Sequence, residues 1–574
     1  MTSTVFKLVL LGCFSMLCCN FSVYAQDLSE LKSSKPFSIS GSIGGGASFF
    51  SSNADYKVEA PFSWNVYGNF TPSVYGISLP FSFIINQYAK SYTSPFTQFG
   101  ISPSYKWMKL HLGYRNLSYS PLVFDGQSFL GGGVELTPGK FYFSAFLGRL
   151  NKAISEDTTY NRYLMPQYAR HGYGFKLGYG NPNQNFSIQF FHAKDDTGSI
   201  TRLHDSLTTM TPQQNTVVGS SWHFQFFKKL TFTGNIALSF LNRDMYYRHI
   251  DSISYYKVPS LINDIHPINY SSVFSYSGQA TLALVLQNFN ASGSYKRVAP
   301  DFQSLGIPYS IDDQEIIAAT ASTSLLKGRL SLSTALNTQH NNLENMLSST
   351  LKTNNGNLAA NLFVNQHLNL SANFNAVEVF QKDGLLKLSD SVKLDQLMLN
   401  LNLAPTYNFS DGANQHTISA NFNYTKLDDR NPVTGPLAGC QSIATSLGYS
   451  LFFSRTYWGV NANFQYSNYN QPGNKYSSTG LNAGVNAQFL KDHNLSTQGS
   501  VGYYVNQNGD LPAGNNTTFS MNASYGVKKH SLGIYGSYIL TPPVNLNPLN
   551  IVNHIPIAVN SKNFSGGITY AYQL

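Results

Sequence analysis

The chain has 574 residues, of which 11% are charged, 14% are aromatic and 45 are glycine, and its formal net charge is +9. An average soluble protein has about 25% charged residues, so this composition argues against an ordinary soluble domain. The negative mean hydropathy, with no run of about 18 apolar residues after the N-terminus, excludes a protein that crosses a membrane with many helices. Low charge with 37 Tyr and 40 Phe instead suits a surface that contacts lipid between aromatic girdles.

Residues 1–25 have the pattern of a secretory signal peptide. Lys7 precedes an apolar core over residues 8–19, and Val23-Tyr24-Ala25 resembles a small-residue cleavage site. We therefore expect a signal peptide at 1–25, a short periplasmic lead at 26–36 and a single domain at 37–574.

In the rest of the chain, apolar and polar residues alternate in many successive segments, which predicts a series of β-strands. We expect about 26 strands of about 9 to 14 residues, within a range of 22 to 28, and the even number is typical of bacterial barrels. Clear examples, in chain order, are 38–50, 62–70, 105–119, 141–150, 171–179, 186–192, 230–240, 281–287, 330–336, 368–374, 460–466, 481–489, 519–527 and 564–572.

The connections between these strands alternate between short and long. Membrane barrels have short periplasmic turns and longer outer loops, so this parity indicates the same arrangement here. The short connections include 137–140, 227–230, 327–329, 454–457, 491–494 and 528–531. The long connections include 151–170, 193–216, 242–269, 296–314, 376–395 and 541–563.

The pattern is cleanest in a hairpin predicted over residues 395–429. Leucines at 397, 399, 401 and 403 share one face of the first strand, and the segment Ser410-Asp411-Gly412-Ala413 supplies the turn. In the second strand Ile418 and Phe422 alternate with Thr417 and Asn421. The hairpin therefore has one apolar face and one face of small amides and hydroxyls.

A water-facing strand would usually carry charged side chains on its polar face. Here that face is nearly uncharged, which predicts an all-β fold, a large closed antiparallel transmembrane β-barrel whose apolar side chains face lipid and whose polar side chains face a lumen. A secreted antiparallel β domain or a β-solenoid would share the alternation and is the alternative. The candidate lumen-lining residues are Asn400, Asn402, Asn421, Asn423, Asn461, Asn463, Asn482 and Asn486.

The last predicted strand, 564–574, resembles the C-terminal signal that the barrel assembly machinery recognises. The residues that carry this resemblance are Gly567, Tyr570, Tyr572 and Leu574. We therefore expect that machinery to be a partner, although the signal more commonly ends in an aromatic residue.

Several short sequence segments resemble segments of Bacteroidota-type outer-membrane β-barrel proteins of unassigned function. They are Tyr114-Arg115 to Ser120, the stretch 129–140, and 295–300 followed by Leu305-Gly306. In such bacteria, exported proteins are O-glycosylated at short Asp-Ser/Thr-apolar sites, and the resemblance implies four candidate sites in predicted outer loops: Thr158, Ser206, Ser252 and Ser391.

No pattern for catalysis, metal binding or cofactor binding accompanies the strands, so we expect no enzyme activity and no cofactor. His204-Asp205, His249 with Asp251, and His266 could form a nucleophile relay in the long loops, but no nucleophile motif accompanies them. His192 and His223 could pair as metal ligands, but no further ligand completes a site.

These observations predict a protein of the outer membrane of a Gram-negative bacterium. The first hypothesis for its function is a channel for passive or partner-gated passage of polar solutes or exported polymers. The alternative is a non-conducting anchor that holds a surface or secreted protein. Expected partners are outer-membrane lipid, the assembly machinery and a surface or periplasmic protein, with no role for nucleic acid.

Overall fold

A computed structural model of the protein describes residues 36–574 except 54–59, 75–76, 88–98, 155–165, 201–209, 251, 254–255, 258–263, 310, 491 and 542–560. The predicted signal peptide and nearly all of the predicted periplasmic lead lie outside these residues.

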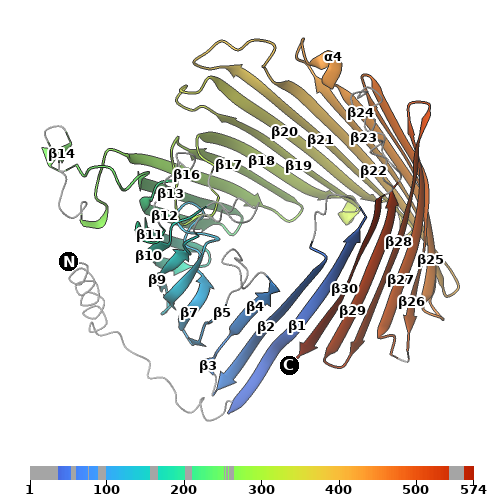
Figure 1. Ribbon diagram of the computed structural model, residues 1–574, viewed down its shortest axis with the longest axis horizontal. Helices are drawn as coiled ribbons and strands as arrows, with labels where there is room; N and C mark the ends of the chain where they lie inside the picture. The colour runs from blue at the N-terminus through green and yellow to red at the C-terminus, as the bar shows by residue number, and fades with distance from the viewer. Residues whose placement is uncertain are drawn as a thin grey trace.

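The chain forms one closed antiparallel barrel (Figure 1). Consecutive strands pair along the sequence, and the barrel closes because the last strand, β30 (Ser561–Gln573), pairs with the first, β1 (Phe37–Ser52). The sheet contains 28 segments, but two strands are each divided into two segments, so the barrel has 26 strands. This number confirms the predicted fold class.

The remaining segments of the first half of the wall are β2 (Phe62–Val74), β3 (Ile77–Ser78), β4 (Phe81–Asn86), β5 (Phe99–Ile101), β6 (Ser104–Tyr105), β7 (Met108–Asn116), β8 (Ser128–Leu136), β9 (Phe141–Asn151), β10 (Arg170–Asn181), β11 (Gln184–Asp195), β12 (Gln214–Phe226), β13 (Leu230–Asn242), β16 (Ser272–Val285) and β17 (Phe289–Val298). A two-stranded ribbon, β14 (Ser252–Ile253) with β15 (Tyr256–Lys257), lies in the connection before β16.

The second half of the wall consists of β18 (Gln314–Leu325), β19 (Leu330–Asn341), β20 (Ser349–Phe363), β21 (Leu368–Asp383), β22 (Asp395–Asp411), β23 (Asn414–Asp429), β24 (Cys440–Phe453), β25 (Trp458–Gln471), β26 (Asn474–Phe489), β27 (Leu495–Asn508), β28 (Leu511–Val527), β29 (His530–Thr541) and β30. Two short helices, η2 (Leu326–Gly328) and α4 (Gly435–Ala438), lie in connections. In the described part of the chain, no helix is long and apolar enough to cross a membrane.

Prolines divide the two interrupted strands. Leu79-Pro80 separates β3 from β4, and Ser102-Pro103 separates β5 from β6. Proline has no backbone N–H to donate to a neighbouring strand, so the ladder stops there. The carbonyl of Pro80 still accepts a hydrogen bond from the N–H of Ser102 at 3.0 Å.

The hairpin predicted over residues 395–429 is confirmed as β22 and β23. The two strands pair from Gln396 with Asp429 to Asp411 with Asn414. Gly412 lies in the turn with a φ of 59°, a backbone conformation that glycine adopts without steric cost.

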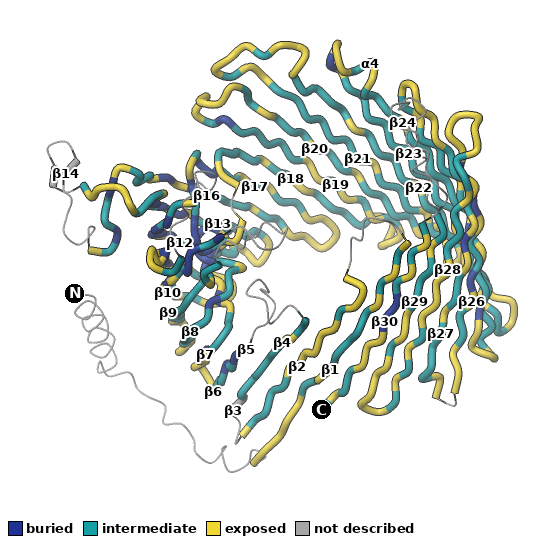
Figure 2. The backbone as a smooth tube through the Cα atoms, in the orientation of Figure 1, coloured by how far each residue is buried: buried dark blue, intermediate teal, exposed yellow. Residues whose placement is uncertain are grey.

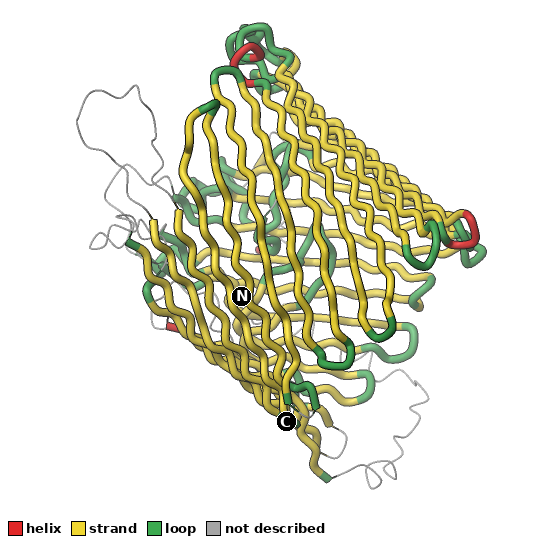
Figure 3. The backbone as a smooth tube through the Cα atoms, turned by 90° about the vertical axis from the view of Figure 1, so that its right-hand side faces the viewer, coloured by secondary structure: helices red, strands yellow, loops and turns green. Residues whose placement is uncertain are grey.

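Turns and loops lie at the two ends of the barrel (Figure 3). The predicted parity holds for most connections, but two connections on the loop side, 472–473 and 509–510, contain only two residues. Some predicted bounds are also wrong. The strand predicted at 105–119 covers only Met108–Asn116, because residues 106–107 form the turn that separates it from β6. The loop predicted at 376–395 begins only after Asp383, because the alternating pattern of β21 continues to that residue.

The two faces of the wall differ in polarity. Large apolar side chains on the outer face have no protein layer over them, and most residues of the long strands are intermediate or exposed (Figure 2). Members of this outer row are Leu147, Phe175, Leu177, Ile188, Ile236, Leu282, Leu336, Leu358, Phe374, Leu447, Phe464, Leu481 and Ile568. A closed barrel with such a surface satisfies its backbone hydrogen bonds internally and belongs in lipid.

Candidate functional site in the barrel lumen

The eight predicted lumen-lining asparagines lie on the face opposite the apolar row. Asn402 pairs in register with Asn373 on one side and Asn423 on the other, and Asn463 pairs with Asn482. The Asn400 side chain donates a hydrogen bond to the Thr425 hydroxyl at 2.8 Å. The other predicted positions, all on this face of β23, β25 and β26, are Asn421, Asn461 and Asn486.

We call the asparagine-rich lumen face of β18 to β28 the amide wall. A depression of about 480 Å³ lies on the lumen face between β17 and β22. It is lined mainly by small polar side chains, with Asn402 at its β22 edge. Its other polar members include Asn290, Ser322, Ser333, Asn361, Ser371 and Asn373. This part of the wall offers hydrogen-bond donors and acceptors without any charged group.

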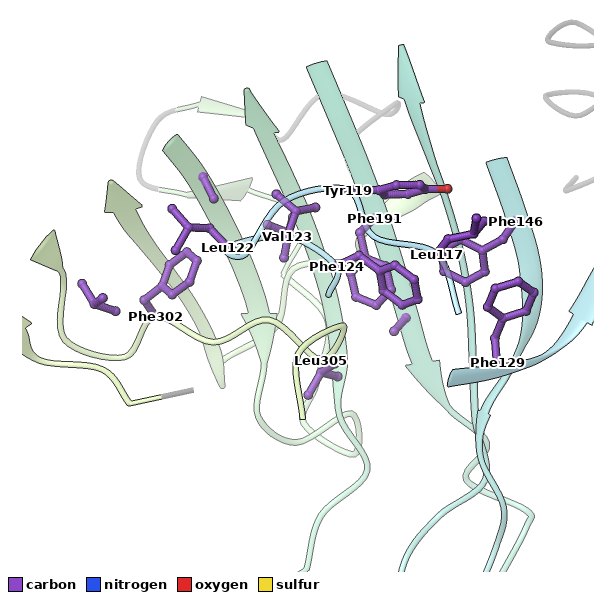
Figure 4. Packing of buried hydrophobic residues seen from close by; sticks show 14 residues of the cluster. Leu117, Tyr119, Leu122, Val123, Phe124, Phe129, Phe146, Phe191, Phe302 and Leu305 are labelled. Atoms are coloured by element: carbon purple, nitrogen blue, oxygen red, sulfur yellow. The ribbon is translucent and has the colours of Figure 1, made fainter. Parts of the chain in front are cut away.

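A different structure covers the lumen face of β8 to β17. Two connections, residues 117–127 after β7 and 299–313 after β17, fold back onto the wall and against each other, and we call them the loop layer (Figure 4). The Ser304 hydroxyl donates to the Val123 carbonyl at 2.6 Å, and the Asp125 N–H donates to the Gly306 carbonyl at 3.1 Å. The two connections therefore form one packed unit inside the barrel.

The loop layer has an apolar core of its own. Phe124 stacks on Phe146 of β9 and Phe191 of β11, with ring centroids 4.4 and 5.3 Å apart. Phe124 and Phe191 are fully buried. The other cluster members are Leu117, Tyr119, Leu122, Val123, Phe129, Ala193, Val217, Ala237, Val298, Phe302 and Leu305. None of these residues comes from β18 to β30, so this core belongs to one side of the lumen.

A fully buried amide on β12 fixes the backbone of the second connection. The Asn215 side chain accepts a hydrogen bond from the Leu305 N–H at 3.0 Å and donates one to the Gln303 carbonyl at 3.2 Å. The Ser239 hydroxyl donates to the same carbonyl at 2.6 Å. Gly306 lies so close to the first connection that an added Cβ would be 2.7 Å from the Val123 carbonyl oxygen.

The first connection is attached to β10. The Lys176 ammonium donates to the Tyr119 carbonyl at 2.8 Å, and the Tyr119 hydroxyl donates to the Gly174 carbonyl at 3.0 Å. Burial raises the pKa of Tyr119 above its ordinary value, which keeps the phenol protonated as a donor.

A cavity of about 570 Å³ lies between the loop layer and the end of the barrel wall. Its lining is polar at Gln127, Asn151, Arg170, Gln303 and Ser304. The rest of the second connection contributes an apolar and aromatic part of the lining, with Leu305, Ile307, Pro308, Tyr309 and Ile311. Arg170 at the start of β10 is held in place by Asp195, with Nε–Oδ1 and Nη2–Oδ2 distances of 2.7 and 3.0 Å.

A serine, a histidine and a glutamate form a hydrogen-bonded chain elsewhere in the wall. The Ser102 hydroxyl lies 3.0 Å from Nδ1 of His111, and Nε2 of His111 lies 2.7 Å from Glu135. Lys109 also lies 3.2 Å from Glu135. The sequence offered no motif for this chain, since its members lie on two strands, β7 and β8, and at a proline interruption. Ser102 is 6% exposed and His111 3%, so both are enclosed by the wall.

The structure separates the two histidines that were considered as a metal pair. Asn185, not His192, is the register partner of His223, while His192 pairs with Thr216, seven residues farther along β12. His192 and His223 also point to opposite faces of the wall because their strand positions differ in parity. No group of three or more His, Cys, Asp or Glu residues that could hold a metal ion occurs in the described ranges.

His266 is instead part of a chain on the outer side of the wall. The Thr216 hydroxyl lies 2.8 Å from Nδ1 of His192 and 3.1 Å from Nδ1 of His266, and Nε2 of His266 lies 3.2 Å from the Asn242 amide oxygen. His249 lies outside this chain and forms an isolated bridge with Asn269. His204, Asp205 and Asp251 lie outside the described residues.

Ser391 is the one candidate glycosylation site whose side chain the structure describes, and it is exposed in the connection between β21 and β22. Ser252 lies in β14, and Thr158 and Ser206 lie outside the described residues. The four candidate assembly residues complete the closing pairs of the barrel: Gly567 with Ser48, Tyr570 with Gly45, Tyr572 with Ile43, and the Leu574 N–H with the Gly41 carbonyl at 2.8 Å.

No protein-family model matches the chain, and no curated protein matches it. Solved structures do match at low identity. The copper transporter OprC is 9% identical, with 94% of this chain and 81% of that chain covered and a TM-score of 0.36. OccK5 (OpdH) of Pseudomonas aeruginosa is 9% identical, covering 68% and 97% with a TM-score of 0.32. The FrpB iron transporter of Neisseria meningitidis is 11% identical, covering 96% and 83% with a TM-score of 0.36.

Similarity at this level carries no functional information. The assignment of the fold therefore rests on the strand pairing and on the apolar outer surface. The chain is a transmembrane β-barrel of the Gram-negative outer membrane.

Proposed function

We propose that the barrel is a channel for passive or partner-gated passage of polar solutes or exported polymers. A barrel of 26 strands encloses more space than its own side chains fill. The observation that carries the proposal is the asymmetry of the lumen. The loop layer packs on β8 to β17, while β18 to β28 present an uncharged amide wall on which the apolar cluster has no member.

The loop layer is the element that narrows such a channel. Its backbone is attached to the wall through Asn215, Ser239 and Lys176, so it acts as a fixed partial barrier. The amide wall opposite it supplies hydrogen bonds that replace those of water around a passing polar solute.

Purified protein in a planar bilayer tests this proposal. We expect stable conductance steps after insertion, and we expect deletion of the second connection, residues 299–313, to raise the conductance. Inserted protein that passes no current until a bound partner is stripped would support the alternative, a non-conducting anchor for a surface or secreted protein. A cross-link through the lumen to that protein would identify it as a partner.

We propose that the Ser102–His111–Glu135 chain is structural and that the protein is not an enzyme. The enclosure of Ser102 and His111 in the wall supports this interpretation, because a nucleophile needs open access to its substrate. A fluorophosphonate probe should leave the folded barrel unlabelled. Labelling of Ser102 that is lost in the Ser102→Ala variant would contradict it.

We also propose the finer assignment to Bacteroidota-type barrels, with the assembly machinery and outer-membrane lipid as partners. The sequence segments at 114–120, 129–140 and 295–306, which resemble such barrels, support it. Mass spectrometry of the native protein should find an O-glycan on Ser391. An unmodified Ser391 in protein from its native envelope would weaken this assignment.

A further inference from the structure

We infer that the cavity between the loop layer and the ends of β9 and β10 binds one short, uncharged saccharide at the outer mouth of the channel. This inference rests on the proposed function, because it names the class of solute that the channel admits. The cavity volume of about 570 Å³ falls within the ~300–1,000 Å³ typical of small-molecule sites.

The polar side of the cavity offers groups suited to hydroxyls. Gln127, Asn151 and Gln303 each bring a carboxamide, which donates and accepts hydrogen bonds. The Gln127 amide N–H already donates to the Asn151 side-chain oxygen at 3.3 Å, so this pair is held in place and offers the Gln127 oxygen and the Asn151 amide N–H to a ligand. The backbone carbonyl of Gln303 is already held by Asn215 and Ser239. Its side chain therefore extends from a fixed point, and binding does not have to order the backbone.

The charges at the cavity favour a neutral ligand. Arg170 is the cationic residue in its lining, and Asp195 neutralises it through two short contacts. The Asp195 carboxylate also accepts the Gln213 N–H at 2.9 Å. Since a cation that already has its counter-ion offers little net attraction to an anion, the cavity is poorly suited to phosphates or carboxylates.

The apolar part of the lining suits the apolar face of a sugar ring. It consists of Leu305, Ile307, Pro308 and Ile311 together with Tyr309, which is 93% exposed. The C–H face of a pyranose covers such an exposed aromatic ring and removes it from water, while the hydroxyls of the sugar reach the carboxamides. A lining that combines carboxamides with an exposed ring therefore matches both faces of a saccharide.

The test uses the full-length barrel with maltotriose and the trimer of N-acetylglucosamine as probes, and triglycine and citrate as comparison solutes. We expect at least one trisaccharide to interrupt the current reversibly when it is added from the loop side, and calorimetry on the detergent-solubilised barrel to show matching binding. Neither triglycine nor citrate should do so.

Two variants locate the site. Gln303→Ala keeps the backbone contacts of that residue, and Tyr309→Ala changes an exposed side chain, so both should fold. Each should weaken saccharide binding about tenfold, the effect of losing one good contact, while Tyr309→Phe retains it. Tyr270→Ala, which removes another exposed tyrosine from an outer connection away from the cavity, is the matched control and should bind as the unchanged protein does.

The outcomes separate the two proposals. A barrel that conducts but binds neither trisaccharide, or binds one equally well in both alanine variants, overturns the saccharide site and leaves the channel intact. A barrel that binds a trisaccharide by calorimetry without passing current upholds the site and overturns the channel.

Discussion

The two sides of the lumen are built on different principles. The side from β8 to β17 carries a packed core with fully buried phenylalanines, like the interior of a soluble domain. The side from β18 to β30 contributes no residue to that core, and its wall relies on long ladders of paired strands and on the lipid outside. Closure of the barrel does not need an internal core, so the loop layer is an additional element inside the lumen.

The largest expected effect comes from breaking the core of the loop layer. Phe191→Ala removes a fully buried ring that stacks on Phe124, and such truncations cost about 3–5 kcal/mol. We expect the layer to detach, which limited proteolysis of the two connections and a rise in conductance would report. Phe464→Ala on the outer face of β25, where the ring is 49% exposed, should leave both readouts nearly unchanged. Equal effects of the two substitutions would remove the distinction between the sides.

Acidification should weaken the attachment of the connection that contains His266, on the side of the barrel from β8 to β17. Burial lowers the pKa of His266 to about 4 from 6.5, so the folded connection holds the neutral ring and the opened connection takes up a proton. The stabilisation is complete above pH 6.5 and is lost as the pH falls from 6.5 towards 4, by up to about 3 kcal/mol.

Hydrogen exchange near residues 264–270 at pH 7.5 and 5.0 measures this effect, and the protection factor, which corrects for the slower intrinsic exchange in acid, should be smaller at pH 5.0. His266→Asn should reduce the pH dependence, although His192 shares the Thr216 hydroxyl and retains part of it. His171→Gln, at an exposed position on β10, serves as the control. An unchanged protection factor across this range would show that His266 is not enclosed.

Removal of the buried amide on β12 should have an intermediate effect. Asn215→Ala leaves the Leu305 N–H and the Gln303 carbonyl with fewer partners in a buried place, at a cost of about 2 kcal/mol. The second connection should become sensitive to protease while the first remains protected through Lys176. Protection of both connections in the variant would show that the apolar core alone holds the layer.

The smallest effect on stability is expected on the amide wall. Asn402→Asp places a carboxylate at the edge of a polar depression and should shift the reversal potential in a salt gradient towards cation preference with stability nearly unchanged. Gln189→Glu buries its carboxylate on the opposite side, since Gln189 is fully buried, and should destabilise that side. A reversal potential that ignores the Asn402 change would argue that ions do not pass this wall.

The sequence predicted the barrel because alternation and turn chemistry are local properties. The hairpin of β22 and β23 illustrates this, as its leucine row and Gly412 define the strands and the turn without any knowledge of neighbours. The predicted strand number is also correct. The predicted end of a strand was wrong where the alternating pattern continues past it, as in β21, which extends to Asp383.

The loop layer was not predicted, because its contacts join residues far apart in the sequence, from 55 positions for Tyr119 with Gly174 to 181 for Val123 with Ser304. A signal was nevertheless present. The connection 117–127 contains Leu117, Tyr119, Leu122, Val123 and Phe124, which is too many apolar residues for a loop that faces water, and the phrase Leu305-Gly306 lies at its contact. Apolar residues crowded into an outer loop of a barrel indicate that the loop folds inward.

The prolines that divide two strands near the start of the chain have a mechanical consequence. Among the described residues, β7 meets its divided neighbour through two residue pairs with β5 and two with β6, and the two divided strands meet through three pairs of β4 with β5 and one of β3 with β6, whereas β1 and β2 share thirteen. Local opening is easiest where the fewest residue pairs join two strands. Under pulling force or heat, we therefore expect the cylinder to open beside the divided strands, and a disulfide engineered across them should raise the force needed to open the wall.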